Sequence, residues 1–332
     1  YGPRTTRYAR IRGLVSLTNS ARFIDMSDPD YTRIPEPAAD VFTAPLIKPA
    51  QVGADWLEPA QRVYTKDEHA LWDELYARQM KLLPGRAVDE FLEGVDALGL
   101  GDGGVPDFQK LSAKLHNATG WSVVPVPMLI PDHVFFYHLA NRRFPAGNFI
   151  RSREEIDYIK EPDVFHDVFG HAPLLLNRDF ADYMEAYGRA GWKALKFNRL
   201  KALGALYWYT VEFGLMDTPA GLRIYGAGIV SSAEESIFAL EAKSPNRLHL
   251  NVDRVMRTDY IISDLQQTYF VIDSFAQLIH ETVDRPFDMI YANLMPGFQY
   301  ATAAVLETDR VYTQGTQEYA LRGGRGSRAR PV

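Results

Sequence analysis

The chain has 332 residues, of which 46% are hydrophobic and 23% charged, and its formal net charge at pH 7 is -6. This composition is typical of a globular protein with a sizeable core, and the acidic balance argues against a nucleic-acid-binding surface. The absence of cysteine excludes disulfides, thiolate catalysis and cysteine-ligated metal sites. No apolar run approaches the roughly 18 residues of a membrane span, and no signal-peptide pattern opens the sequence, so we expect a cytoplasmic protein without membrane contacts.

Residues 1–60 are rich in proline and show little periodicity, which predicts an irregular N-terminal arm. A helix is predicted to begin after Thr65, because Glu68 completes a capping box, and to stop at Pro84. Apolar spacing predicts further helices over residues 88–98, 105–118, 131–141, 161–169, 178–196 and 199–213. Short strands are predicted at 149–151, 222–225 and 268–272, followed by a last helix that opens at Asp273 and Ser274.

Together these elements predict a mainly α (α+β) fold, with one helical domain and small β-sheets over residues 61–295. Residues 296–332 have no periodic pattern, so we expect a C-terminal tail with a solvated, arginine-rich end. The sequence shows no internal repeat and no glycine-rich phosphate-binding loop.

Two of the eight histidines, His166 and His171, fall in one short segment. Paired imidazoles suit a divalent first-row metal. A spacing of five would leave the two side chains about 140° apart on an ideal α-helix, unlike the same-face spacing of four in helical zinc motifs. We expect Gly170 to relax the turn so that the rings converge, although two such histidines could equally be core or surface groups.

A third metal ligand must come from elsewhere, and Glu212 is the candidate because it is the one carboxylate in the aromatic segment 206–215. A carboxylate among apolar residues is costly to bury unless it is paired or bound to a cation, although it could also face solvent or pair with an arginine. Two histidines and one carboxylate would leave open positions on a metal, as in iron(II) oxygenases. Asp163 could orient a ligand ring or a bound water, or cap the helix that follows it.

At these residues the sequence resembles the pterin-dependent aromatic amino acid hydroxylases, in particular their bacterial phenylalanine-hydroxylating members. The resemblance covers about residues 60–290. It is carried by segments 82–87, 118–121, 162–175, 207–215, 224–232, 244–247 and 268–275. The family implies a ferrous ion held by His166, His171 and Glu212, and the aromatic amino acid hydroxylase fold.

The resemblance also implies a tetrahydropterin cofactor, such as tetrahydrobiopterin. Phe135 matches the aromatic residue on which the pterin ring stacks. Ile130 and Asp132 match the loop that approaches the pterin, and Asp167 and Tyr207 match residues that line the same cavity.

On the substrate side, Arg151 matches the arginine that holds the amino acid carboxylate, a role suited to its bidentate geometry. Trp208, Phe213 and Ile262 match positions around the aromatic ring, and Ser231 matches a serine near the substrate and the metal ligands. The implied reaction is the hydroxylation of L-phenylalanine to L-tyrosine with O2.

Three alternatives remain open at this point. Hydroxylation of tryptophan or tyrosine is disfavoured, because Trp208 crowds the pocket and no acid occupies position 262 to meet a phenol. A zinc hydrolase could use the same ligands with Asp167 as its general base, and a non-catalytic small-molecule binder is also possible. The sequence shows neither the regulatory domain nor the terminal heptad helix of animal members of the family, so we expect a monomer.

Overall fold

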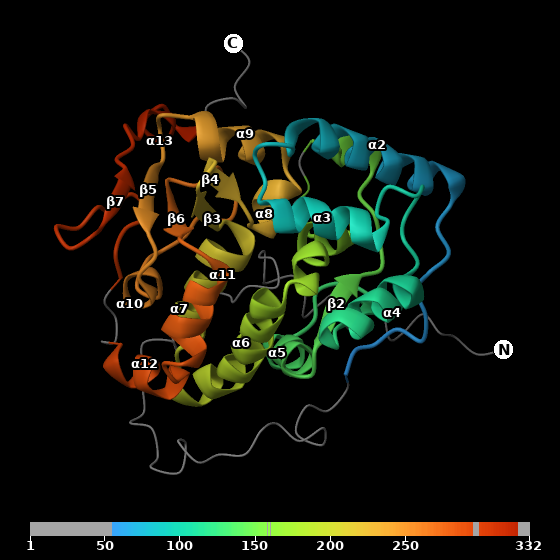
Figure 1. Ribbon diagram of the computed structural model, residues 1–332, viewed down its shortest axis with the longest axis horizontal. Coiled ribbons are helices and arrows are strands. Elements are labelled where there is room, and N and C mark those ends of the chain that lie inside the picture. The colour runs from blue at the N-terminus through green and yellow to red at the C-terminus, as the bar shows by residue number, and fades with distance from the viewer. Residues whose placement is uncertain (1–54, 158, 160, 295–298, 325–332) are drawn as a thin grey trace, which may run out of the picture.

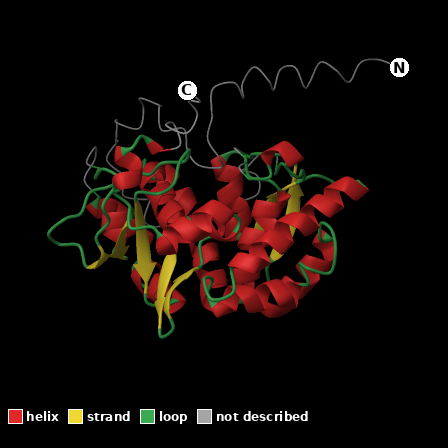
Figure 2. Cartoon of the chain, turned by 90° about the horizontal axis from the view of Figure 1, so that it is seen from above, coloured by secondary structure: helices red, strands yellow, loops and turns green. Residues whose placement is uncertain are grey.

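The computed structural model describes residues 55–157, 159, 161–294 and 299–324. About half of the described chain is helical, and short strands gather at two separate places, as Figure 2 shows. The predicted mainly α fold with small sheets is therefore confirmed. The first 54 residues of the expected N-terminal arm and the arginine-rich end of the tail lie outside the described residues.

The α-helices of eight or more residues form most of the domain. They are α2 (Lys66–Leu82), α3 (Asp89–Leu98), α4 (Phe108–Thr119), α5 (Asp132–Ala140), α6 (Arg178–Phe197), α7 (Leu200–Tyr207) and α9 (Ala233–Glu241). The shorter ones are α8 (Ala227–Val230), α10 (Val252–Val255), α11 (Phe275–Leu278), α12 (Phe287–Asn293) and α13 (Glu318–Leu321). Among the described residues, three π-helices, η5 (Phe165–His171), η7 (Trp208–Glu212) and η8 (Ile279–Val283), and two short 3-10 helices, η4 (Arg153–Glu155) and η6 (Pro173–Leu176), complete the helical part.

Local sequence explains where several of these helices begin. The predicted capping box of α2 is present: the Thr65 hydroxyl accepts a hydrogen bond from the Glu68 amide, and the Glu68 carboxylate accepts one from the Thr65 amide. The Asn177 and Ser274 side chains cap α6 and α11, where each accepts one hydrogen bond from a backbone amide of the first turn. Each cap fixes the starting residue of a helix and with it the face that the helix buries.

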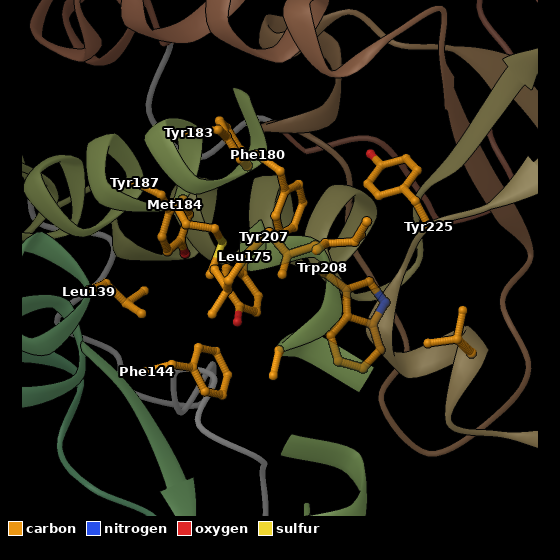
Figure 3. Close-up of a cluster of buried hydrophobic side chains, with 14 of the residues drawn as sticks. Leu139, Phe144, Leu175, Phe180, Tyr183, Met184, Tyr187, Tyr207, Trp208 and Tyr225 are labelled. Atoms are coloured by element: carbon orange, nitrogen blue, oxygen red, sulfur yellow. The ribbon is translucent and has the colours of Figure 1, made fainter. Parts of the chain in front are cut away.

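Helix α6 lies at the centre of the hydrophobic core (Figures 1 and 3). Tyr183, Met184 and Tyr187 on its buried face are shielded from solvent and pack with residues from neighbouring elements. Gly188 lets α5 approach closely, because a Cβ at this position would collide with the backbone of Leu139 and Ala140. The pairing of α5 with α6 carries Phe135 toward the centre of the molecule.

Two sheets flank this helical core. In the small sheet, β1 (Ser122–Val126) runs parallel to β2 (Arg143–Gly147). The second sheet has the order β4-β3-β6-β5-β7. Its strands are β3 (Leu215–Thr218), β4 (Gly221–Ile224), β5 (Asn246–His249), β6 (Thr268–Ile272) and β7 (Val311–Thr313). The pairs β3–β6 and β5–β6 are parallel, whereas the pairs β3–β4 and β5–β7 are antiparallel.

The predicted strand at 149–151 is wrong, because β2 ends at Gly147 and the chain beyond it hydrogen-bonds to a different segment. The Arg151 amide donates to the Asp163 carboxylate, and the Phe149 carbonyl accepts from the Val164 amide. The strand predicted at 268–272 is β6, and the one predicted at 222–225 is β4 displaced by one residue.

The segment expected to be a tail contributes to the fold where it is described. Strand β7 pairs with β5 at the edge of the larger sheet, and the Asn246 side chain accepts a hydrogen bond from the Gly315 amide. The domain boundary at residue 295 stays a proposal, but residues 299–324 pack against the domain. In the described part of the chain, no helix is both long and apolar enough to cross a membrane.

Candidate metal centre and substrate cavity

Three side chains from two helical segments converge on one point. The Nε2 atoms of His166 and His171 lie 3.2 Å apart. Glu212 brings Oε1 to 3.2 Å from His171 Nε2 and Oε2 to 3.6 Å from His166 Nε2. The three ligand atoms thus lie within 4.8 Å of one another, which is close enough for all of them to bind one ion. The structure brings together the metal ligands predicted from sequence.

The unusual spacing of the histidines is explained by the π-helix η5, which contains both. A π-helix closes i→i+5 hydrogen bonds, so residues five apart lie nearly above one another instead of on different faces. Glu212 ends the second π-helix, η7, where the Phe213 amide donates to the Trp208 carbonyl five residues earlier. Gly170 lies within η5 and leaves room for close packing against the backbone of Ala227.

The electrostatics of this triad fit a cation. Glu212 and His171 are almost completely buried, and the Glu212 carboxylate pairs with no lysine or arginine of the described residues. Although burial alone raises the pKa of the Glu212 carboxyl, the two imidazoles hold that pKa well below its usual range. Burial lowers the pKa of His171 despite the carboxylate beside it, which favours the neutral ring that binds metals. A buried carboxylate and two imidazoles form a donor set suited to iron(II), with coordination positions left open.

Ser231 orients the first of these ligands. Its hydroxyl donates to the Ala227 carbonyl at 2.7 Å and lies 3.0 Å from His166 Nδ1. Because the hydroxyl hydrogen is directed to the carbonyl, the Ser231 oxygen accepts from Nδ1–H, and Nε2 of His166 stays unprotonated for a metal. The ring-orienting role considered for Asp163 therefore belongs to Ser231.

Asp163 instead holds Arg151. Its two oxygens accept from Arg151 Nε and Nη2, each at 2.9 Å, in a bidentate pair that is almost fully buried. The same carboxylate accepts from the His166 amide at 3.0 Å, so Asp163 does cap the helical segment as predicted. The guanidinium holds the pKa of Asp163 below its usual range against the effect of burial. Arg151 Nη1 makes no hydrogen bond with the described residues and remains available to an anion.

A cavity of about 160 Å³ opens beside the triad. Its walls include His166 and Glu212 together with the five residues that the resemblance places near the substrate: Arg151, Trp208, Phe213, Ser231 and Ile262. The Trp208 ring packs on Phe213 with centroids 4.5 Å apart and stacks on Tyr260 at 5.0 Å. The cavity therefore combines the Arg151 guanidinium, an aromatic surface and two of the three candidate metal ligands.

The residues assigned to the pterin occupy a different place. None of Ile130, Asp132, Phe135, Asp167 and Tyr207 lines this cavity. Phe135 is buried and meets Tyr207 edge-on at 6.0 Å, and Tyr207 in turn lies 6.3 Å from the His171 ring. Figure 3 shows Tyr207 and Trp208 as members of one buried cluster, in which the Tyr207 ring lies 4.9 Å from that of Tyr187. Tyr207, the last residue of α7, thus lies near His171, whereas Trp208, the first residue of η7, lines the cavity.

Two contributors were not singled out by the sequence reasoning. A Cβ at Gly228 would lie 2.9 Å from the Phe213 ring and 3.1 Å from Glu212 Oε2, so glycine keeps the carboxylate free. Gln266 is buried and accepts a hydrogen bond from the Trp208 indole at 2.8 Å. The glycine-rich run around Gly228 was a detectable signal, whereas nothing in the local sequence indicates the partner of Gln266.

Comparison with known proteins identifies the family to which the chain belongs. The model of the biopterin-dependent aromatic amino acid hydroxylases matches residues 57–303, and the chain belongs to that family. Among its relatives, the phenylalanine-4-hydroxylase of Caulobacter vibrioides is 57% identical over 272 residues, or 82% of this chain and 92% of the relative. The phenylalanine-4-hydroxylase of Ralstonia nicotianae is 55% identical over 262 residues, covering 79% and 83% of the two chains.

Solved structures of phenylalanine hydroxylase from Chromobacterium violaceum share the fold. One with bound cobalt is 53% identical, with a TM-score of 0.75, and covers 78% of this chain and 94% of that chain. Another, with bound iron and phenylalanine, is 52% identical with a TM-score of 0.74 over the same shares. The aromatic amino acid hydroxylase fold expected from the sequence is thereby confirmed.

Proposed function

We propose that this chain is a phenylalanine 4-monooxygenase, which converts L-phenylalanine to L-tyrosine with O2, a tetrahydropterin and one ferrous ion. The observation that carries the proposal is that the buried triad of His166, His171 and Glu212 adjoins a cavity that also holds Arg151 and Trp208. Membership of the family and relatives more than 50% identical that are named phenylalanine-4-hydroxylases support it.

The side chains of the cavity perform binding and orientation. Arg151, fixed by Asp163, presents its free Nη1 to the substrate carboxylate. Trp208, Phe213 and Ile262 form an apolar site for the ring, and this orientation lowers the entropic part of the barrier. His166, held by Ser231, keeps its Nε2 aimed at the metal position. When bound, the iron and the tetrahydropterin supply the oxygen-activating chemistry that no side chain provides.

We place the pterin on the side of the metal centre opposite the substrate cavity, where Phe135 would stack on its ring. Tyr207, Asp167, Ile130 and Asp132 would complete this site. The support is the chain of ring contacts from Phe135 through Tyr207 to His171. In the present arrangement Phe135 is buried, so pterin binding requires neighbouring side chains to move.

We also propose that the enzyme acts as a cytoplasmic monomer. The support is the acidic, cysteine-free composition. Light scattering on the purified protein tests the oligomeric state.

Product analysis tests the reaction itself. The protein, loaded with iron(II) and supplied with a reduced pterin and O2, is incubated separately with phenylalanine, tyrosine and tryptophan. We expect tyrosine from phenylalanine and a much lower rate with tryptophan, because the Trp208 wall limits the ring pocket. Preferred turnover of tryptophan or tyrosine would contradict the substrate assignment, and pterin-independent hydrolysis with zinc would contradict the reaction class.

A further inference from the structure

The loop of residues 261–266 forms part of the cavity wall and is held by one buried amide. Ile262 and Asp264 line the cavity. The Gln266 side chain donates from Nε2 to the carbonyls of Ile261 at 2.9 Å and Asp264 at 3.0 Å. Its Oε1 accepts from the Trp208 indole at 2.8 Å. Only this orientation of the amide satisfies all three bonds, so Gln266 links the loop to the aromatic wall.

The loop is also held from outside, by the last described helix of the chain. The Tyr319 hydroxyl of α13 donates to Asp264 Oδ1 at 2.7 Å. Tyr319 is itself anchored, because its amide donates to the Ser244 hydroxyl at 3.0 Å and its ring meets that of Phe238 in α9 edge-on at 5.3 Å. Helices α13 and α9 accordingly lie side by side in Figure 1.

A second contact comes from the same segment. A Cβ at Gly324 would collide with the Asp264 carboxylate, so the backbone at Gly324 passes directly against that side chain. The family model ends at residue 303, so both contacts come from residues outside the matched part of the chain. The position of the cavity loop therefore depends on a segment that the match to the family does not include.

We propose that Tyr319 is a positioning residue for the ring pocket, acting through Asp264 and Gln266 on Ile262 and Trp208. The C-terminal segment then helps to set the size of the pocket and thereby the preference for phenylalanine over larger rings. This inference rests on the proposed function, since it assigns part of the substrate discrimination of the same cavity.

The test compares Tyr319→Phe with Tyr312→Phe. The first substitution removes only the hydroxyl that reaches Asp264. The second removes a hydroxyl from β7 of the same segment, where the Tyr312 ring meets His249 and does not line the cavity. Hydrogen exchange of the amides at 261–266 reports on the loop without any need for turnover, and steady-state kinetics with phenylalanine and tryptophan report on the pocket.

Tyr319→Phe loses the hydrogen bond to the Asp264 carboxylate, so we expect faster amide exchange at 261–266. The KM for phenylalanine should rise by about threefold to tenfold, and kcat should change less than about twofold. The ratio of kcat/KM for tryptophan to that for phenylalanine should rise in the same variant and stay constant in Tyr312→Phe. Unchanged exchange, or faster exchange with unchanged KM and ratio, would overturn the proposal. If the wild-type protein failed to hydroxylate phenylalanine, the proposed function would fall, and the exchange data alone would decide whether Tyr319 holds the loop.

Discussion

At the scale of single residues, Asp132 carries a carboxylate that the fold disfavours in its charged form. It begins α5, is half-buried and accepts no hydrogen bond from the described residues. Burial raises its pKa from 3.8 to about 6. The pKa of the Asp132 carboxyl is therefore higher in the folded protein than in the unfolded one. Its contribution to the free energy of unfolding is largest below pH 4 and is lost as the pH rises through about 6.

We therefore expect Asp132→Asn to raise the free energy of unfolding at pH 8 by about 1–2 kcal/mol, which is the full linkage value reduced for partial exposure. The gain should shrink as the pH is lowered through 6 and vanish near pH 4. Urea unfolding of the metal-free protein at several pH values measures it, with Asp96→Asn on the exposed face of α3 as the control for removing a charge. A gain that is equal at every pH would show that the effect has another origin.

At the scale of elements, the close approach of α8 to η7 determines whether Glu212 can bind a metal. Gly226 and Gly228 allow the backbone of α8 to pass directly against Glu212. A methyl group at position 228 would lie 3.1 Å from Glu212 Oε2 and would press on the carboxylate that we propose as a metal ligand.

Gly228→Ala should therefore weaken iron binding by about tenfold or more, as changes around metal ligands commonly do. The free energy of unfolding of the metal-free protein should fall only slightly, because the Phe213 ring can rotate away from the added methyl. Iron titration and urea unfolding of the metal-free variant separate the two effects. Equal iron affinity in both proteins would mean that the carboxylate has more freedom than the packing suggests.

Sequence reasoning was most successful for elements whose signal is local. The capping box at Thr65 and the strand-like run at 268–272 depend on neighbouring residues and were predicted correctly. The π-helical form of 165–171 could not be predicted, because its extra residue per turn is stabilised by tertiary packing and not by any residue type. Strand β2 was missed, and a strand was predicted at 149–151 instead, because Pro145 lies within β2 and apolar residues continue past its end.

At the scale of the whole molecule, segments far apart in sequence form the site together. The proposed metal ligands come from η5 and η7, the proposed ring pocket from η7 and the 261–266 loop, and the outer support of that loop from α13. The resemblance to a known family indicated the proposed metal ligands and the cavity residues. It indicated no role for residues after 303, which the family model does not match. Contacts such as Tyr319 with Asp264 join positions 55 residues apart and leave no periodic trace in the sequence.

The central claim is that His166, His171 and Glu212 together bind one iron ion, and iron content tests it most directly. Wild-type protein, His171→Ala and His116→Ala, a control histidine at the exposed end of α4, are loaded with iron(II) without oxygen and freed of unbound metal. Wild type and His116→Ala should retain one iron per chain and unfold at a higher temperature than their metal-free forms, since a ligand bound only by the folded state stabilises it. His171→Ala should lose most of the iron and all of that stabilisation. Full iron content and an undiminished thermal shift in His171→Ala would contradict the account.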